Sequence, residues 1–307
     1  MQHEAPPDHL ARFHDDPDHA DDAVGRDGRP LGLVVGNCQA ESLRIALGDE
    51  LDLVRTPPVH ELTRSDLPHL TRLLGRADVL VTQPVRDDYR DLPVGTRQLE
   101  ALLRPGARTV RVPVIRFAGL HPHHAIVRPP SDTSLVPPLV AYHDLRVLSE
   151  AAGHPLPPTA PAAAVREIAR ESLEQLRRRE AAHGTVVVHD LFTHPDFAQM
   201  RTLNHPGNPV WEALAARVAD ALGIAAPPPL TRPLLASVHA PREAHVIEAW
   251  GLADEPRPDW VVDGRTVTTG QVREAHLDFY ARHPDAVAAG LERHAGAIAV
   301  LAGAGAR

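Results

Sequence analysis

The stretch LGLVVGNCQAESLRIAL, Leu31 to Leu47, decides the fold class of this 307-residue chain. It begins with a continuous apolar run, Leu31 to Val35, which is typical of a β-strand covered on both faces. Gly36 and Asn37 end the run, and apolar residues then recur at helical spacing until Gly48. The stretch therefore predicts a strand, a tight turn and a helix, which is the repeating unit of a parallel sheet.

The same alternation continues along the first half of the chain. Apolar runs at 51–57 and 78–84 predict two further strands, and a helix pattern that Ser65 or Asp66 could cap lies between them. A short helix at 96–103 and a strand that contains Pro113 follow. Strands that alternate with helices on this scale predict a doubly wound, mostly parallel α/β sheet, and the second half of the chain is expected to be mostly helical.

Composition predicts a tail and one folded region. Residues 1–29 are rich in Asp, His and Pro and poor in aliphatic side chains, so we expect a disordered tail. No clean linker interrupts residues 30–307, which predicts a single domain with its core sheet and helices in 30–225 and a C-terminal extension in 226–307. Further expected elements are helices at 138–152, 162–182 and 209–222, a strand at 186–188, a hairpin that turns at Asp263-Gly264 and two terminal helices.

Charge and cysteine content narrow the classes of function. The chain has 40 acidic and 32 basic residues and a net charge of -8, which disfavours nucleic acid as a partner. One cysteine cannot form an internal disulfide, and the first residues lack the apolar segment of a secretory signal. No apolar run is long enough to span a bilayer. We therefore expect a cytoplasmic protein without membrane insertion.

Cys38, the single cysteine, is the first candidate catalytic residue. The pattern places it at the carboxyl edge of the first strand, where open α/β sheets bind ligands. It also begins a helix, whose N–H groups and dipole favour the reactive thiolate and could hold an oxyanion. The alternative is that Cys38 is a small hydrophobic residue buried between strand and helix.

A thiol nucleophile needs a general base, and His205 in RTLNHPGNPVW is the best candidate. It precedes a predicted helix, and Asn204 beside it could orient its ring. Gln83 ends its strand at the same sheet edge as Cys38, so its amide could donate to an oxyanion or simply satisfy a loop. Other histidines that could act as the base are His121, His123, His124, His189 and His194.

Metal and phosphate motifs are weak in this sequence. The histidines of HPHH and HDLFTH match no zinc motif, so we expect no metal. GNCQAES lacks the glycines of the dinucleotide fingerprint, and there is no Walker A sequence, which counts against NAD and ATP. Arginines that could clamp a pyrophosphate or a 3′-phosphate nevertheless follow the predicted strand ends. They are Arg86, Arg90, Arg111, Arg116 and Arg128.

Four blocks together resemble the WcbI family of polysaccharide-biosynthesis proteins: VVGNCQAESL, DVLVTQPVRDDY, VPVIRFAGLHPH and RTLNHPGNPVWEAL. They span roughly residues 31–222, and Gly-Asn-Cys-Gln and Asn-His-Pro are the most specific parts. The resemblance implies an α/β fold like that of SGNH hydrolases, of the flavodoxin-like kind. It also implies that the protein binds coenzyme A and transfers an acetyl group to a capsular sugar.

The resemblance also implies roles for individual residues. Cys38 takes the place of the serine of SGNH enzymes, Gln83 that of an oxyanion-hole residue, and His205 lies in the block that supplies the base. The chain departs from the SGNH pattern because Gly-Asp-Ser is absent and Thr202 stands where an aspartate would precede the histidine by three residues. The residues expected to contact coenzyme A are Asn37, Gln39, Arg116, His121 and Asn204.

The expected function is therefore transfer of an acyl group from acyl-CoA to a hydroxyl of a sugar or related small acceptor, in polysaccharide or secondary-metabolite biosynthesis. A histidine-rich loop from Gly119 to Pro138 could be the lid that excludes water. One alternative is an SGNH-like esterase or thioesterase that uses the same residues on water. Another is a non-catalytic ligand-binding protein in which Cys38 is packed in the core. The sequence does not indicate an oligomeric state.

Overall fold

The computed structural model describes residues 10–14 and 28–303, which form two compact units. Unit 1 comprises Met1–Val114, Arg177–Val188 and Asn208–Arg232, and unit 2 comprises Ile115–Leu176, His189–Gly207 and Pro233–Arg307. Each unit is described by itself. The expected boundary between residues 225 and 226 falls inside the last segment of unit 1, and the single domain from 30 to 307 stays a prediction.

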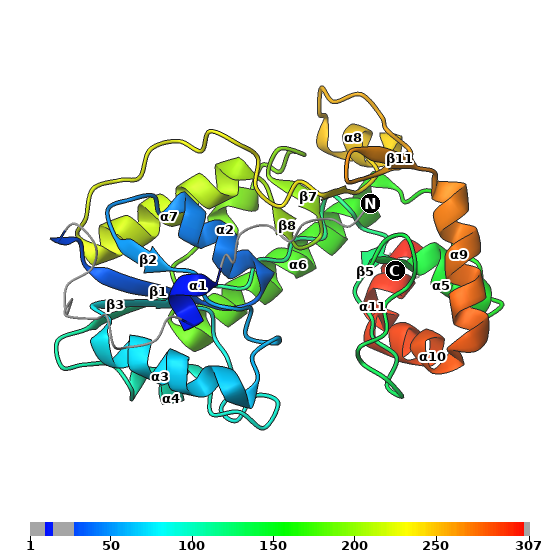
Figure 1. Ribbon diagram of the computed structural model, residues 1–307. Coiled ribbons are helices and arrows are strands. Elements are labelled where there is room, and N and C mark those ends of the chain that lie inside the picture. Colours follow the sequence, from blue (N-terminus) through cyan, green and yellow to red (C-terminus); the bar gives the residue numbers. More distant parts are fainter. Residues whose placement is uncertain (1–9, 15–27, 304–307) are drawn as a thin grey trace. The chain divides into compact units, whose positions relative to one another are not determined.

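Unit 1 contains a four-stranded parallel sheet in the order β2-β1-β3-β4 (Figure 1). Every residue of the first three strands in the chain is buried, which is why their sequences are predominantly apolar. The edge strand β4 has exposed and half-buried residues instead. The strands are β1 (Leu31–Val35), β2 (Asp52–Val54), β3 (Val79–Thr82) and β4 (Arg108–Arg111).

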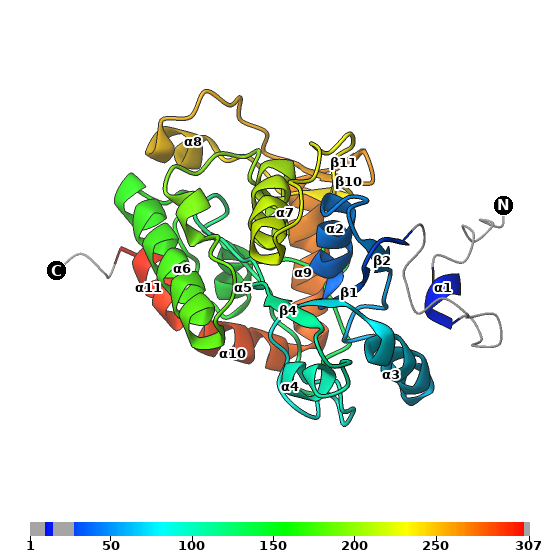
Figure 2. The same ribbon diagram turned by 90° about the vertical axis from the view of Figure 1, so that its left-hand side faces the viewer.

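Helices cover both faces of this sheet, which confirms the predicted doubly wound fold (Figure 1). The chain leaves β1 for β2 on one side and returns to β3 on the other side of β1, so right-handed crossovers place α2 and α3 on opposite faces. Helix α7 packs against α2, and the two lie side by side in Figure 2. The helices of unit 1 among the described residues are α1 (Ala11–His14), α2 (Cys38–Ala46), α3 (Leu67–Arg76), α4 (Thr96–Glu100) and α7 (Asn208–Leu222), with a 3-10 turn at Arg64–Asp66.

Part of the predicted disordered tail is folded. Residues Ala11–His14 form the short helix α1, which packs against α3, and the side chain of Phe13 is fully buried in the core of unit 1. The guanidinium of Arg12 bonds both carboxylate oxygens of Asp52 at 2.7 Å. The expected disorder is therefore wrong for these residues, because one aromatic side chain and one ion pair anchor them. Residues 1–9 and 15–27 of the expected tail lie outside the described residues.

The described residues of unit 2 combine helices with three small sheets. Its helices are α5 (Leu145–Ala151), α6 (Ala162–His183, whose last residues belong to unit 1), α8 (Ala244–Trp250), α9 (Thr269–Arg282), α10 (Pro284–Arg293) and α11 (Ala295–Leu301), with a 3-10 turn at His189–Phe192. Its strands are β5 (His124–Ala125), β6 (His143–Asp144), β7 (Met200–Thr202), β8 (His205–Pro206), β9 (Val238–His239), β10 (Trp260–Val262) and β11 (Arg265–Val267). Within the described ranges, no helix is long and apolar enough to cross a membrane.

Four expected elements differ from the structure among the described residues. The strand expected to contain Pro113 ends at Arg111, so Pro113 lies in the segment that follows β4. Residues 186–188 form no strand, and the side chain of Val187 is 44% exposed. The helix expected from residue 138 begins only at Leu145, where the carboxylate of Asp144 accepts the N–H of Arg146 and caps it. Up to residue 303, where the description ends, the C-terminal region has three helices rather than two, since Pro284 starts a new one. The hairpin with its turn at 263–264 is confirmed.

Candidate active site

The carboxyl ends of β1 and β3 bring the predicted catalytic residues of unit 1 together. Gly36 to Gln39 follow β1, and Gln83 follows β3, its neighbour in the sheet. Because the chain leaves β1 toward β2 on one side and β3 lies on the other, this edge is the topological switch point of the sheet. Open α/β sheets bind ligands at such points.

Gly36 allows the two strand ends to approach closely. A Cβ atom at position 36 would overlap Oε1 of Gln83 and lie 2.9 Å from its Cδ. The Gln83 side chain is held there because the backbone N–H of Asn37 donates to Oε1 at 2.9 Å. Only glycine leaves room for this amide at the end of the strand.

The amide nitrogen of Gln83 also forms hydrogen bonds within unit 1. This nitrogen, Nε2, donates to Oε1 of Gln39 at 3.1 Å and to the carbonyl oxygen of Pro113 at 3.4 Å. Gln83 is 4% exposed and Gln39 only 1% exposed. The sequence predicted an oxyanion donor at Gln83 and a coenzyme contact at Gln39, and the structure shows both amides holding the turn. We call Gly36, Asn37, Gln39 and Gln83 the turn clamp.

Cys38 is the first residue of α2 and is exposed. Asn37 caps the helix, and its Oδ1 accepts the N–H of Gln39 at 2.9 Å. The alternative that Cys38 is a small buried residue is therefore wrong. The turn clamp presents the thiol to solvent at the positive end of the helix, an environment that favours a reactive cysteine.

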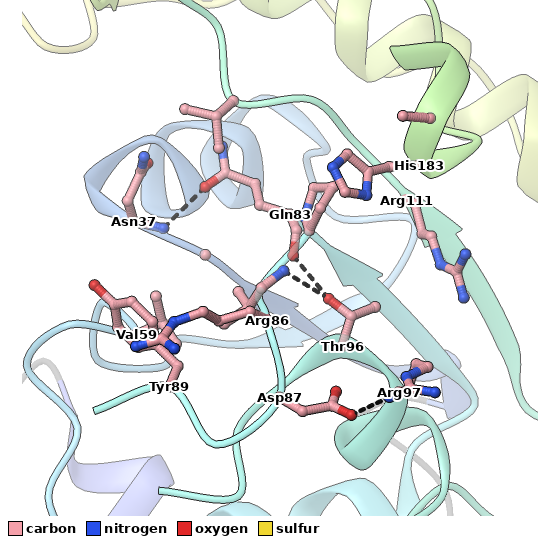
Figure 3. Close-up of a pocket in the computed structure, with 15 residues that line it drawn as sticks. Asn37, Val59, Gln83, Arg86, Asp87, Tyr89, Thr96, Arg97, Arg111 and His183 are labelled. Atoms are coloured by element: carbon pink, nitrogen blue, oxygen red, sulfur yellow. Dashed lines mark hydrogen bonds and ion pairs between the residues drawn. The ribbon is translucent and has the colours of Figure 1, made fainter. Parts of the chain in front are cut away.

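A cavity of about 750 Å³ lies beside the turn clamp (Figure 3). Gly36, Asn37 and Gln83 form part of its wall. The hydroxyl of Thr96 supports the wall because it accepts the N–H of Val85 at 2.9 Å and donates to the carbonyl oxygen of Gln83 at 3.2 Å. The remaining lining residues are Val59, Pro84, Val85, Arg86, Asp87, Tyr89, Arg97, Arg111, Val114, Ala182 and His183.

The cavity carries more cationic than anionic side chains. Arg97 pairs with Asp87, and Arg111 bonds both oxygens of Glu100, which is outside the lining, at 2.8 Å. The guanidinium of Arg86 lies 5.9 Å from the ring centroid of Tyr89 and has no carboxylate partner in the part of the chain that is described. Such a wall is suited to an anionic ligand.

The sequence predicted only part of this cationic wall. Arg86 and Arg111 were expected at the sheet edge because they follow strand ends. Arg97 and His183 lie on α4 and at the end of α6, and no motif indicated them. Arg90 does not line the cavity and donates to the carbonyl oxygen of His60 at 2.5 Å.

The predicted base belongs to unit 2, where His205 starts the short strand β8. Asn204 beside it accepts a hydrogen bond from the hydroxyl of Tyr142 at 2.8 Å. The hydroxyl of Thr202, at the position of the missing aspartate, donates to the same Tyr142 oxygen at 2.9 Å and accepts the backbone N–H of His205 at 3.2 Å. Thr202 therefore fixes the backbone of His205 and not its ring.

Burial, together with the charges of Arg201 and His239, lowers the pKa of His205 to about 4. The ring is therefore neutral at neutral pH and can accept a proton, as a weak base. Its Nδ1 is buried, and the described residues offer it no hydrogen-bond partner. A carboxylate that orients the ring, as in the usual triad, is not found among them.

The other residues of unit 2 that were expected to contact coenzyme A lie near the segment from Thr202 to His205 or in the core of the unit. The N–H of Phe117 donates to the carbonyl oxygen of Leu203 at 2.9 Å, which joins the segment of Arg116 to that of Asn204. His121 is 2% exposed and stacks on His124 with ring centroids 5.5 Å apart. In the loop from Gly119 to Pro138, which was expected to be a lid, His121 and His124 therefore lie in the interior of unit 2 and not over a cavity.

These features define a doubly wound α/β protein with an exposed thiol at the switch point of its sheet. A family model described as "Polysaccharide biosynthesis enzyme WcbI" matches residues 31–227, well over half of the 307 residues. The chain therefore belongs to the WcbI family of polysaccharide biosynthesis enzymes, and the resemblance of the four sequence blocks is confirmed.

A solved structure of WcbI, described as a novel polysaccharide biosynthesis enzyme, has the same fold. The match has a TM-score of 0.74 and 18% sequence identity, and it covers 89% of this chain and 99% of the other. That structure is described as the native protein without a disulfide bond between coenzyme A and a cysteine. No curated protein matches this chain significantly.

We predict that Gly36→Ala destabilises the protein by about 1–3 kcal/mol, because the new Cβ displaces Gln83 and breaks its bond to Asn37. In a Gln83→Ala background the Cβ has room, so the added effect of Gly36→Ala should be smaller by at least about 1 kcal/mol. Urea unfolding of the four proteins measures this coupling. Gly75→Ala is the control, because its Cβ would meet only one atom, at 3.9 Å. Additive effects at positions 36 and 83 would contradict the turn clamp.

We also predict that unit 2 loses stability on mild acidification. Burial lowers the pKa of His121 to about 3 and those of His124, His143 and His205 to about 4. The unfolded chain therefore binds more protons between about pH 6.5 and pH 4, and stability falls as pH falls through this window. Each ring should contribute about 2 kcal/mol of loss between pH 7 and pH 5.

Urea unfolding at the two pH values measures this loss. His205→Asn should reduce it, because asparagine does not titrate, and replacement of the exposed His60 by alanine should not. Equal stability of the unmodified protein at pH 7 and pH 5 would show that these rings are not buried as neutral groups.

Proposed function

We propose that this chain transfers an acyl group, in the simplest case acetyl, from acyl-CoA to a hydroxyl of a sugar or related polar acceptor in polysaccharide or secondary-metabolite biosynthesis. The observation that carries the proposal is the exposed Cys38 thiol, which directly follows Gly36 and Asn37 in the wall of a cavity with cationic side chains, although Cys38 itself is not a lining residue. Membership of the WcbI family supports the biosynthetic setting.

Coenzyme A has the chemistry that this wall would bind. Its thiol end is uncharged, and its diphosphate and 3′-phosphate are anions, for which Arg86, Arg97 and Arg111 supply guanidinium groups. The cavity volume of about 750 Å³ lies in the usual range for small-molecule sites. The description of the solved WcbI structure mentions a disulfide bond between coenzyme A and a cysteine, which that structure lacks. The mention supports the same ligand, and Cys38 is the single cysteine of this chain.

The proposed reaction has two steps. The Cys38 thiolate attacks the thioester carbonyl, the bond between that carbon and the coenzyme sulfur breaks, and the coenzyme thiolate leaves and takes up a proton. The acceptor hydroxyl then attacks the acyl-cysteine, its proton passes to a base, and Cys38 is released as a thiolate. The sequence predicts His205 as this base, and the assignment stays a prediction; its buried ring in unit 2 is neutral at neutral pH. The same intermediate attacked by water would make the protein a thioesterase.

The first experiment is calorimetric titration of the purified chain with coenzyme A. We expect micromolar affinity, about 8 kcal/mol of binding free energy. Arg86→Ala should weaken binding about tenfold, because it removes a charge-assisted contact with a phosphate. Arg64→Ala is the matched control, since Arg64 is exposed in unit 1 and lies outside the cavity. No binding, or equal binding by the Arg86 and Arg64 variants, would contradict the donor site.

Turnover tests the covalent step separately. With acetyl-CoA and a panel of sugar acceptors, Cys38→Ser should lose nearly all release of coenzyme A while it still binds the coenzyme. A serine variant that keeps most of its turnover would show that the acceptor attacks the thioester directly. Release of coenzyme A that does not depend on any acceptor would favour the thioesterase.

A further inference from the structure

Three side chains of unit 2 form a compact cluster outside the sheet-edge site. His123 precedes β5, and Glu243 and His245 lie at the start of α8. Nδ1 of His123 is 3.2 Å from Oε2 of Glu243, and Nε2 of His245 is 3.8 Å from the same oxygen. All three atoms lie within 4.8 Å of one another. The cluster thus joins parts of the chain that are 120 residues apart.

We propose that His123, Glu243 and His245 bind one divalent transition-metal ion of the zinc type. Two imidazole nitrogens and one carboxylate oxygen are ligands that such ions take in proteins, and three protein ligands leave a fourth position for water or a ligand oxygen. Tetrahedral bonds of about 2.0–2.2 Å place neighbouring ligand atoms about 3.4 Å apart. The distances of 3.2 and 3.8 Å to Oε2 of Glu243 are close to that spacing.

Burial supports the assignment because the cluster contains a buried nitrogen that lacks a hydrogen-bond partner among the described residues. The side chain of His123 is only 1% exposed. Nε2 of His245 is buried and, within the described residues, has no hydrogen-bond partner. A buried nitrogen without a partner is unfavourable, and a metal ion would satisfy it. Burial also lowers the pKa of His245, which keeps the nitrogen lone pair available to a cation.

Arg146 occupies one carboxylate oxygen of Glu243, and the other oxygen, Oε2, faces the two histidines. Nη1 of Arg146 donates to Oε1 of Glu243 at 2.7 Å, while its other nitrogens bond the carboxylate of Asp144 at 2.6–3.1 Å. Asp144 thus balances the guanidinium charge, and Glu243 keeps its own negative charge.

Glu243 remains ionised even though it is largely buried. Burial alone would raise its pKa, but the hydrogen bond with His123 and the charge of Arg146 hold that pKa well below its usual range. Arg146 then orients the carboxylate from outside, as the partners of metal ligands commonly do.

The test is calorimetric titration of the full chain with Zn²⁺ after treatment with a chelator. We expect one tightly bound ion per chain. His245→Ala should weaken that site at least about 100-fold, since even the loss of an outer partner weakens metal sites 10–100-fold. Glu243→Gln should have a similar effect. Because the chain has 20 histidines, His60→Ala, at a residue that is exposed and outside the cluster, is the matched control and should bind like the unmodified protein.

Co²⁺ gives a second readout that does not require any variant to fold. A four-coordinate site with two imidazoles should give the unmodified protein an intense visible absorption band, which Zn²⁺ displaces at one equivalent. No stoichiometric Zn²⁺ binding, or equal affinity in His245→Ala and His60→Ala proteins, would overturn the proposal. Both readouts measure the metal and not turnover, so the outcome is independent of the proposed acyl transfer.

Discussion

The hydrogen bond from the backbone of Asn37 to the side-chain oxygen of Gln83 is the contact on which the sheet-edge site depends. It joins the carboxyl ends of two parallel strands, and it can form only because position 36 has no Cβ. The same amide reaches Gln39 and Pro113, so one buried glutamine fixes both the turn and the first residues of α2. With the turn fixed, Cys38 has a defined place at the start of a helix.

This arrangement explains why Gly-Asn-Cys-Gln is the most specific part of the sequence block. The glycine admits the Gln83 amide, and the asparagine both bonds that amide and caps the helix. The cysteine is exposed, and the second glutamine holds the clamp from the buried side. Three of the four residues therefore hold the turn in place, and the cysteine is the one that is available to react. The cationic wall beside them comes from the loop after β3, which carries Arg86, and from α4, β4 and the end of α6.

The sequence predicted the features that depend on local pattern. Continuous apolar runs identified the buried strands, and the spacing after Gly36 placed Cys38 at a helix start. Features that depend on contacts between distant residues were not predictable. The sequence left open whether the Gln83 amide donates to an oxyanion or satisfies a loop, because nothing local shows that Asn37 and Gln39 bond it. Phe13 anchors α1 in a segment whose composition suggests disorder, and His123 meets Glu243 only in the folded unit.

The central claim is that the turn clamp presents Cys38 to the thiol end of coenzyme A. The most direct measurement is the rate at which Cys38 forms a mixed disulfide with the disulfide of coenzyme A, compared with glutathione disulfide at equal concentration, followed by intact mass. Each adduct forms by attack of the Cys38 thiolate on one sulfur and release of the other half as a thiol. We predict a single coenzyme adduct that forms at least about tenfold faster, because binding raises the local concentration of the disulfide. Equal rates with the two disulfides would contradict the account.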